Sequence, residues 1–204
     1  MRKIIFIALL GFVTSASGQY SFDKNDFFEI GFAFKTMSNS DYLAKSTYST
    51  SLFEWADSDI KSKELGGIAV GMKYGKAFAS FAHIVFDIEY AQYKIEAQSP
   101  VEYRETALET GDVLSLKALN IGFGPRFKLI GTEGFELSVE GGGKAFHTLN
   151  AGDDLVGGYY GRVIAGVNLN RRVQVNAKYG YESTVGKYAA TDLPAELALH
   201  FKIY

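Results

Sequence analysis

Large apolar residues in this chain recur at every second position, and the charged residues stand between them. In the stretch 85–94, VFDIEYAQYK, Phe86 and Ile88 have one parity and Asp87 and Glu89 have the other. A period of two is the pattern of a β-strand, because successive side chains point to opposite faces of a sheet. One face of this strand therefore meets an apolar environment, and the other meets a polar or charged one.

The same alternation predicts eight strands. They lie at 27–35, 67–75, 84–94, 119–129, 135–144, 159–169, 173–182 and 196–204. Most of them are close to the roughly 9 to 11 residues that a tilted transmembrane strand needs. Pro125 falls in the apolar set of the fourth strand and predicts a bulge or a strand end, because proline donates no hydrogen bond to a sheet.

The predicted connections alternate between long and short. Tight turns are expected at 75–79, 130–134 and 170–172, and longer loops at 37–65, 96–116, 146–157 and 183–194. A meander with all its long loops at one end is the arrangement of outer-membrane barrels. The sequence therefore predicts an all-β fold, an eight-stranded antiparallel up-and-down transmembrane β-barrel.

Charged residues fall on one face of the predicted strands, while the apolar set contains no Asp, Glu, Lys or Arg. A lysine or arginine facing lipid at mid-bilayer costs about 2 to 4 kcal/mol, whereas opposite charges can pair in an interior. We therefore expect a charge network in the lumen, with Asp87 and Glu89 near Lys73, Lys128 or Arg126. The expected members are Glu29, Lys35, Lys73, Asp87, Glu89, Arg126, Lys128, Glu136, Glu140, Lys144, Arg162, Lys178 and Glu182, with Glu196 and Lys202 on the same face.

Aromatic residues gather near the ends of the predicted strands, as in the two girdles that membrane barrels place at the bilayer interfaces. At the turn end they are Phe28, Tyr74, Phe127, Phe135 and Phe201, and at the loop end Phe34, Tyr90, Tyr159 and Tyr181.

Residues 1–18, MRKIIFIALLGFVTSASG, have the basic start, apolar run and small-residue close of a secretory signal peptide. We expect cleavage after Gly18, so that residues 19–204 form a single barrel domain in the outer membrane. With no cysteine, the chain cannot rely on disulfides. Its 21 basic and 23 acidic residues give no indication of a nucleic-acid partner.

These features together resemble the small eight-stranded outer-membrane barrels, the group of outer membrane protein X, the attachment-invasion-locus adhesins and the barrel domain of outer membrane protein A. The resemblance covers residues 19–204 and lies in the architecture, without a residue-specific motif. It implies that outer-membrane lipid, lipopolysaccharide and the barrel assembly machinery are partners. Such barrels usually end with an aromatic residue in phase with the outward-facing set, whereas Tyr204 is out of phase with Phe201.

Two other kinds of barrel share parts of this pattern. A secreted lipocalin-like barrel that binds an apolar ligand has the same alternation, with the apolar residues turned inward. The loop rhythm and the uniformly large apolar set favour the membrane barrel. A small porin-like channel is the other alternative, although an eight-stranded barrel is only wide enough for its own side chains.

We expect no enzymatic activity, cofactor or metal. Barrels that modify lipid A need a His and Ser pair, with an acid, at the outer rim. Only His147 is near the loop end, and it has Thr148 beside it but no adjacent serine. The acidic pairs in the predicted loops lack the ligand spacing of a calcium loop.

The first long loop carries aromatic residues in a polar frame, namely Tyr42, Tyr48, Phe53 and Trp55. Aromatic anchors surrounded by polar residues are common in contact surfaces. They are equally what a loop that folds back over the barrel mouth, or lies on the lipopolysaccharide layer, would need. The sequence therefore predicts a non-enzymatic outer-membrane protein with a structural or adhesin-like role through its long extracellular loops. It does not identify the surface ligand.

Overall fold

The computed structural model describes residues 26–36, 62–97, 101–103, 106–149, 155–185 and 191–203. No helix within these ranges is long and apolar enough to cross a membrane. The strands are β1 (Phe27–Thr36), β2 (Ser62–Ala79), β3 (Ala82–Ala97), β4 (Val101–Tyr103), β5 (Thr106–Leu108), β6 (Val113–Gly131), β7 (Phe135–Thr148), β8 (Leu155–Asn168), β9 (Val173–Thr184), β10 (Thr191–Asp192) and β11 (Ala195–Ile203).

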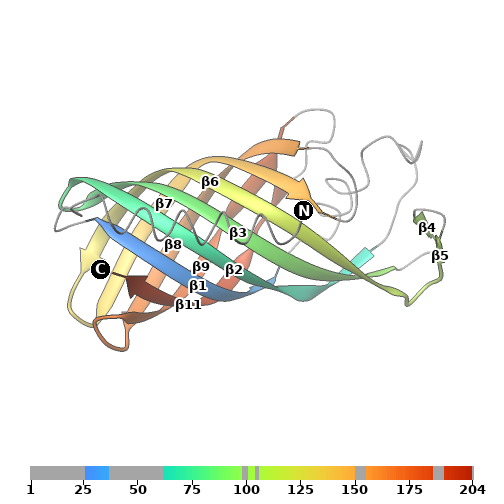
Figure 1. Cartoon of the computed structure of the whole chain (residues 1–204), viewed down its shortest axis with the longest axis horizontal. Helices are drawn as coiled ribbons and strands as arrows, with labels where there is room; N and C mark the ends of the chain where they lie inside the picture. The colour runs from blue at the N-terminus through green and yellow to red at the C-terminus, as the bar shows by residue number, and fades with distance from the viewer. Residues whose placement is uncertain are drawn as a thin grey trace.

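Eight of these strands close into a barrel (Figure 1). The order around the wall is β1-β2-β3-β6-β7-β8-β9-β11, every pairing is antiparallel, and β11 pairs back onto β1. Closure pairs the strands of the wall on both sides, so their backbone groups find partners without water. The predicted eight-stranded antiparallel up-and-down barrel is confirmed.

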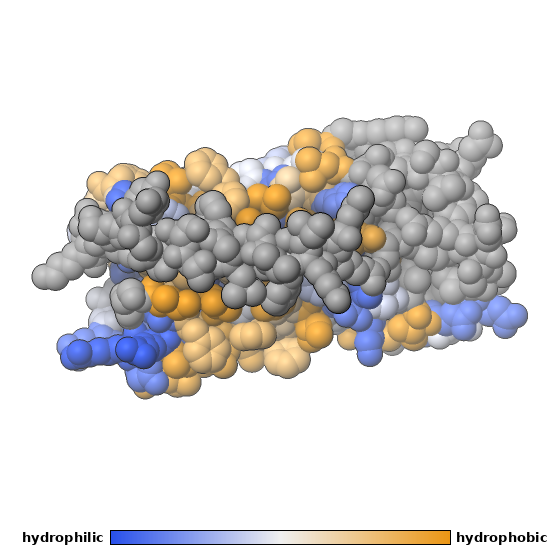
Figure 2. Space-filling view, viewed as in Figure 1, coloured by the Kyte–Doolittle hydropathy of each residue, from blue (hydrophilic) through white to orange (hydrophobic). Residues whose placement is uncertain are grey.

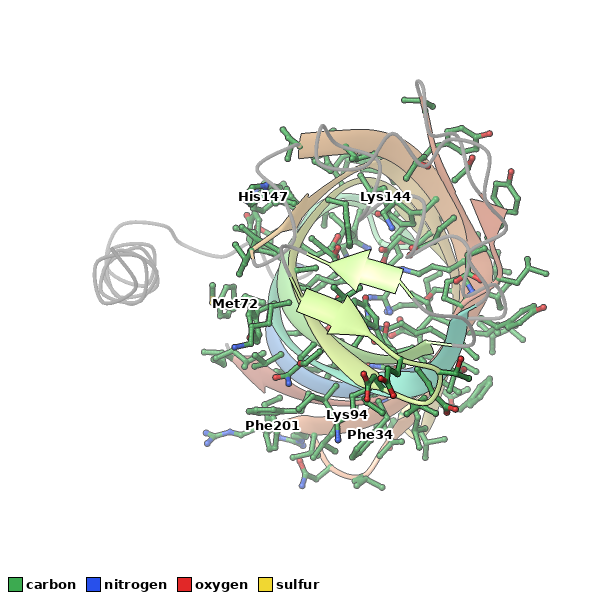
Figure 3. The ribbon with its side chains drawn as sticks, turned by 90° about the vertical axis from the view of Figure 1, so that its right-hand side faces the viewer. Phe34, Met72, Lys94, Lys144, His147 and Phe201 are labelled. Carbon is green, nitrogen blue, oxygen red and sulfur yellow. The ribbon has the colours of Figure 1, made fainter. Side chains whose placement is uncertain are left out.

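The strands β2, β3 and β6 extend further toward the loop end than the alternation predicts. They contain 18, 16 and 19 residues, so the predicted loops 37–65 and 96–116 are too long. The second of these segments also contains the β4–β5 hairpin, which lies beyond the opening at the loop end (Figures 1 and 3). Strand pairing continues past the point where apolar alternation stops, which is why periodicity missed these extensions.

The prediction of a bulge or strand end at Pro125 is wrong. Pro125 pairs with Ile84 of β3, and the register shift between β6 and β7 lies at Lys128/Ile130. Beside Pro125, β6 and β7 approach so closely that a Cβ on Gly124 would lie 2.0 Å from the carbonyl oxygen of Gly141. Because glycine has no Cβ, the two strands can lie this close without being displaced, and β6 keeps the same register before and after Pro125.

The outer face of the wall is apolar and the inner face is charged. Phe34, Phe123 and Leu197 are 71%, 58% and 55% exposed, whereas Lys73 and Glu140 are 5% and 3% exposed. In Figure 2 the hydrophobic residues cover the middle of the wall, with hydrophilic residues toward its ends. An interior lined by charge does not suit an apolar ligand, so the lipocalin-like alternative is wrong.

Aromatic side chains lie on the outer face at both ends of the wall. At the turn end Phe78 meets Phe127 edge to face, with ring centroids 6.5 Å apart. At the loop end the rings of Tyr159 and Tyr181 lie 6.0 Å apart. Rings in these positions mark the two interfaces of the bilayer.

The distance of an outward-facing residue from the bilayer centre should determine how far a charge at that position lowers the free energy of unfolding. Replacing Ile88 of β3 by lysine should lower the free energy of unfolding in lipid vesicles by about 2 to 4 kcal/mol, because the ammonium would face the hydrocarbon. The measurement is urea unfolding in phosphatidylcholine vesicles, followed by circular dichroism.

Two matched variants control for the substitution itself. Gln92→Lys is on the same face of β3 but nearer the loop end, and it should cost less than about 1 kcal/mol. Glu89→Gln is one residue from Ile88 but faces inward, and it too should be milder than Ile88→Lys. Equal losses in Ile88→Lys and Gln92→Lys would contradict the assigned membrane depth.

Candidate functional site

The interior of the barrel contains the charged residues that the alternation assigns to the lumen. Twelve of the thirteen predicted network residues form ion pairs, with one another or with Glu196, and the thirteenth, Glu29, lies within hydrogen-bond distance of His200. The thirteen come from the inward faces of seven wall strands, and Glu196 and His200 add the eighth, β11. Figure 3 looks in from the loop end, with Lys144 inside the ring of strands and Phe34, Met72 and Phe201 outside it.

Glu140 of β7 is the centre of this network. Its fully buried carboxylate accepts hydrogen bonds from Lys73 Nζ at 3.0 and 3.2 Å, from Arg162 Nε at 3.0 Å and from Tyr160 Oη at 3.2 Å. Arg162 Nη2 makes a further contact with the same carboxylate. Because Lys73 belongs to β2 and Arg162 to β8, Glu140 ties distant parts of the wall together through the lumen.

The partners of the two acids in 85–94 differ from those expected. Asp87 lies beside Lys73 in the strand register, but its ion pair is with Arg162, at 3.7 Å. Glu89 pairs with Lys35 of β1 at 2.5 Å. The expected position of Asp87 near Lys73 is confirmed by the register, although the Lys73 ammonium reaches across the lumen to Glu140. Arg126 and Lys128 pair with Glu136 of the adjacent strand β7 and not with either acid.

A second group of charges lies nearer the loop end. Lys35 bridges Glu89 and Glu196, the latter at 3.4 Å, and Lys178 pairs with Glu196 at 2.5 Å. Asn120 of β6 donates to Glu89 at 3.0 Å. This chain of contacts runs from β9 through β11, β1 and β3 to β6. Lys144 and Glu182 form a separate pair between β7 and β9.

At the turn end, a histidine that the predicted network omits joins the charges. His200 Nδ1 lies 2.9 Å from Glu29 Oε2, and its ring rests on Gly31, where a Cβ would lie 3.2 Å from Nε2. Arg126 pairs with Glu136 at 2.6 Å and donates through Nε to Ser138 Oγ at 3.1 Å. His200 has the same parity as Glu196 and Lys202, which is the sequence signal that indicates its inward position.

Apolar side chains close the lumen toward the loop end. Tyr93, Leu116 and Phe146 are 2%, 1% and 2% exposed and pack with inward-facing alanines. We call these three residues the loop-end seal. Strand parity could have identified them, since Tyr93 is in phase with Glu89 and Phe146 with Lys144, but no charge drew attention to their positions.

An aromatic ring occupies the turn end of the lumen. The ring of Phe27 meets His83 edge to face, with centroids 5.2 Å apart, and Arg126 Cζ lies 5.4 Å from its centre. It rests on Gly75, where a Cβ would lie 2.1 Å from the ring. We call Phe27 the turn-end seal.

Little space is left between the two seals. A cavity of about 50 Å³ lies among Lys35, Glu89, Lys144 and Arg162, and another of about 30 Å³ lies beside Lys73 and His200. Cavities of this size hold a few water molecules. Within the described ranges, no group of three or more His, Asp or Glu residues is arranged to hold a metal ion.

Some predicted features lie outside the described residues. These are residues 1–18, the loop contact candidates Tyr42, Tyr48, Phe53 and Trp55, and Tyr204.

A closed wall of eight strands, apolar toward its surroundings and ion-paired within, defines a transmembrane β-barrel of the outer-membrane type. Among solved structures the chain is similar to Neisserial surface protein A, with 11% identity over 88% of this chain and 97% of that one and a TM-score of 0.48. It is also similar to the outer membrane protein OprG from Pseudomonas aeruginosa (12% identity, 90% and 98% covered, TM-score 0.49). It is similar as well to Ail, the attachment invasion locus protein of Yersinia pestis, with 12% identity over 87% of this chain and 97% of that one and a TM-score of 0.42. No protein-family model matches the sequence, and no curated protein matches it.

Removing the central carboxylate should be costly. Glu140→Gln would leave the buried cations Lys73 and Arg162 without their shared counter-ion, and we expect the free energy of unfolding to fall by about 3 to 5 kcal/mol. The measurement is urea unfolding in vesicles. Lys76→Gln is the control, because the Lys76 side chain is 57% exposed in its pair with Asp26 and should contribute no more than about 1 kcal/mol.

A double variant separates loss of the pair from general damage. Adding Lys73→Met to Glu140→Gln removes one of the stranded charges and should recover part of the lost stability. If the free energy of unfolding lost in the double variant equals the sum of the losses in Glu140→Gln alone and Lys73→Met alone, the central role of the carboxylate is contradicted.

Proposed function

We propose that the protein is a non-conducting, non-enzymatic barrel of the outer membrane that has a structural role and presents its loop end for surface contact. The observation that carries this proposal is the filled interior. Ion pairs brace the lumen, and the two seals lie toward its ends. A barrel built in this way is a rigid support rather than a passage for solutes.

The filled lumen argues against the porin-like alternative. Conduction needs a continuous path along which water or polar groups of the protein can solvate an ion. Here the central carboxylate and its three partners interrupt the polar middle of the barrel, and the loop-end seal lies between that middle and the loop end. Opening a path would require several buried ion pairs to separate together.

The positions of the histidines argue against lipid A chemistry. His83 and His200 are each 5% exposed and lie inside the barrel, away from lipid. His147 faces outward at the loop end, and its register partners Leu119 and Leu155 are apolar. A nucleophile and base pair needs both groups within hydrogen-bond reach, and neither of these partners supplies a hydroxyl.

The loop end is the surface on which an adhesin-like role would depend. Long loops of such barrels face the exterior, and β2, β3 and β6 project toward that side (Figure 1). We propose that residues 1–18 direct export, that the barrel assembly machinery inserts the chain, and that Tyr42, Tyr48, Phe53 and Trp55 contribute to surface contacts.

Single-channel recording in a planar bilayer tests the structural role. The wild-type barrel should be silent, because its polar middle is closed toward both ends. Combining Glu140→Ala with Phe27→Ser and Phe146→Ser removes the central carboxylate and one ring toward each end, and it should allow a small ionic leak that no single variant allows. Such a leak would show that the recording detects an opened lumen. Stable unitary steps in the wild-type protein would support the channel instead.

Replacing residues 40–61 with a short Gly-Ser linker tests the surface role. The variant should fold, because β1 ends at Thr36 and β2 begins at Ser62, and it should lose most binding of whole cells to host-cell or matrix surfaces. Phe53→Ser with Trp55→Ser should reproduce most of this loss, whereas Ser49→Ala with Ser51→Ala should not. Unchanged binding by the linker variant, at equal surface expression, would contradict the adhesin-like role.

A further inference from the structure

Among the described residues, several buried polar atoms of the lumen have no hydrogen-bond partner in the protein. They include both ends of the Gln174 amide and Oδ1 of Asn176, which are consecutive inward residues of β9. The Gln174 side is almost completely enclosed, with 1% of the residue exposed, and Asn176 is 2% exposed. A buried polar group that lacks a protein partner binds ordered water in most proteins, because leaving it unpaired costs free energy.

The two β9 amides converge over a glycine. Asn176 lies opposite Gly166 of β8 and Ala198 of β11, so both of its inward neighbours are small. A Cβ on Gly166 would lie 2.5 Å from Asn176 Oδ1 and 2.7 Å from Gln174 Nε2. An acceptor and a donor therefore meet above this glycine, and one water molecule can donate to the first and accept from the second.

Two cavities continue from these amides toward the middle of the barrel. The smaller one, of about 30 Å³, is lined by His200, which lies opposite Gln174. Lys178, the next inward residue after Asn176, lines it as well. Because Lys178 and Asp87 line both this cavity and the larger one of about 50 Å³, the two cavities adjoin.

The larger cavity has unpaired atoms of its own. Asp87 Oδ1 and Asn120 Oδ1 are two more buried acceptors in the described part of the chain that have no protein partner, and both residues line this cavity. The unpaired atoms thus lie along one polar route, which runs from Gln174 and Asn176 through the two cavities to Asp87 and Asn120. We call these four residues the polar file.

Polar side chains lead from the polar file to the turn end. Asn168 lies opposite Gln174, and both Asn168 and Lys202 are half-buried. Lys202 Nζ donates to Asn168 Oδ1 at 3.4 Å, which is near the long limit of a hydrogen bond. The turn-end seal contacts the other side of the lumen, since the ring of Phe27 meets residues of β2, β3 and β6, namely Gly75, His83 and Arg126.

Toward the loop end the surroundings of the polar file are apolar. Tyr93 of the loop-end seal lines the larger cavity and is 2% exposed, and Leu116 of the same seal is 1% exposed. The polar file therefore has a polar end and an apolar end. Because the short turns of outer-membrane barrels face the periplasm, the polar end is the periplasmic one.

We propose that bound water occupies the polar file and exchanges with solvent through the turn end of the barrel, while the loop-end seal keeps it from the outside. The middle of the lumen then communicates with the periplasm on one side. This inference goes beyond the proposed function, because it concerns the interior and does not depend on what the loops contact.

Water fits the polar file better than an ion does. The charged residues that line the larger cavity are balanced, with four bases and four acids, so an added ion would leave a net charge in the lumen. The unpaired atoms comprise one donor, Gln174 Nε2, and several acceptors, and water can serve both kinds. The two cavities have room for a few water molecules.

The test is nuclear magnetic resonance of the refolded full-length protein in phosphatidylcholine nanodiscs, with magnetisation transferred from water to side-chain amides. The pH is mildly acidic, so that direct hydrogen exchange of the amides is slow. We expect cross-peaks between water and the NH2 groups of Gln174, Asn176 and Asn120 in the wild-type protein.

Two variants should block the turn end of the polar file. Gln174→Leu with Asn176→Leu removes both amides, and Gly166→Ala keeps them but crowds the point where they meet. Each should abolish the water cross-peak of Asn120, which lies beyond both cavities and keeps its own surroundings. Gln92→Leu is the matched control, because it removes an amide from the outer face of β3, and it should leave the Asn120 cross-peak unchanged.

Heat-modifiable migration shows which variants are folded, and Gly166→Ala keeps the test decisive if the double variant does not fold. Absence of water cross-peaks at Gln174 and Asn176 in the folded wild-type protein would mean that the amides are dry and would overturn the proposal. An undiminished Asn120 cross-peak in the folded turn-end variants, or an equal loss in Gln92→Leu, would overturn entry of water through the turn end.

Discussion

In hydrocarbon, every backbone N–H and C=O must find a partner within the protein, and the rest of this structure follows from that constraint. Eight strands meet it by closing on themselves, with β11 paired to β1. Closure turns one face of every strand to lipid and the other to a narrow interior. The apolar residues are on the face toward lipid, and the charged residues are on the face toward the interior.

The interior then has to accommodate many charges in little space. Burying an ion costs several kcal/mol unless opposite charges and further hydrogen bonds compensate for the lost water. Glu140 meets this demand with contacts to Lys73, Tyr160 and Arg162, and Lys35 meets it by bridging two carboxylates. The same compensation fills the lumen, which is why a barrel with a charged interior need not conduct.

The outer face carries a second kind of information. Its apolar residues form the belt that faces lipid, and this belt ends at different kinds of residue on different strands. On β3, β6 and β7 this boundary has Lys94, Lys117 and His147, whereas on β8 it has Leu155. The outer face of β3, β6 and β7 therefore differs from that of β8 at the loop end.

The sequence by itself determined the number of wall strands, the face that each residue presents and the charged character of the lumen, because strand parity is a local property that any window of the chain reveals. The ends of the strands could not be predicted from the sequence, because β3 and β6 continue as paired strands after apolar alternation has stopped. Only the tertiary structure decided which charges pair. Lys73 lies beside Glu29 and Asp87 in the register, yet its ammonium binds Glu140 from the far side of the lumen. The stagger of the closed barrel sets which inward residues share a level, and that stagger depends on all eight pairings at once, so no single strand encodes it.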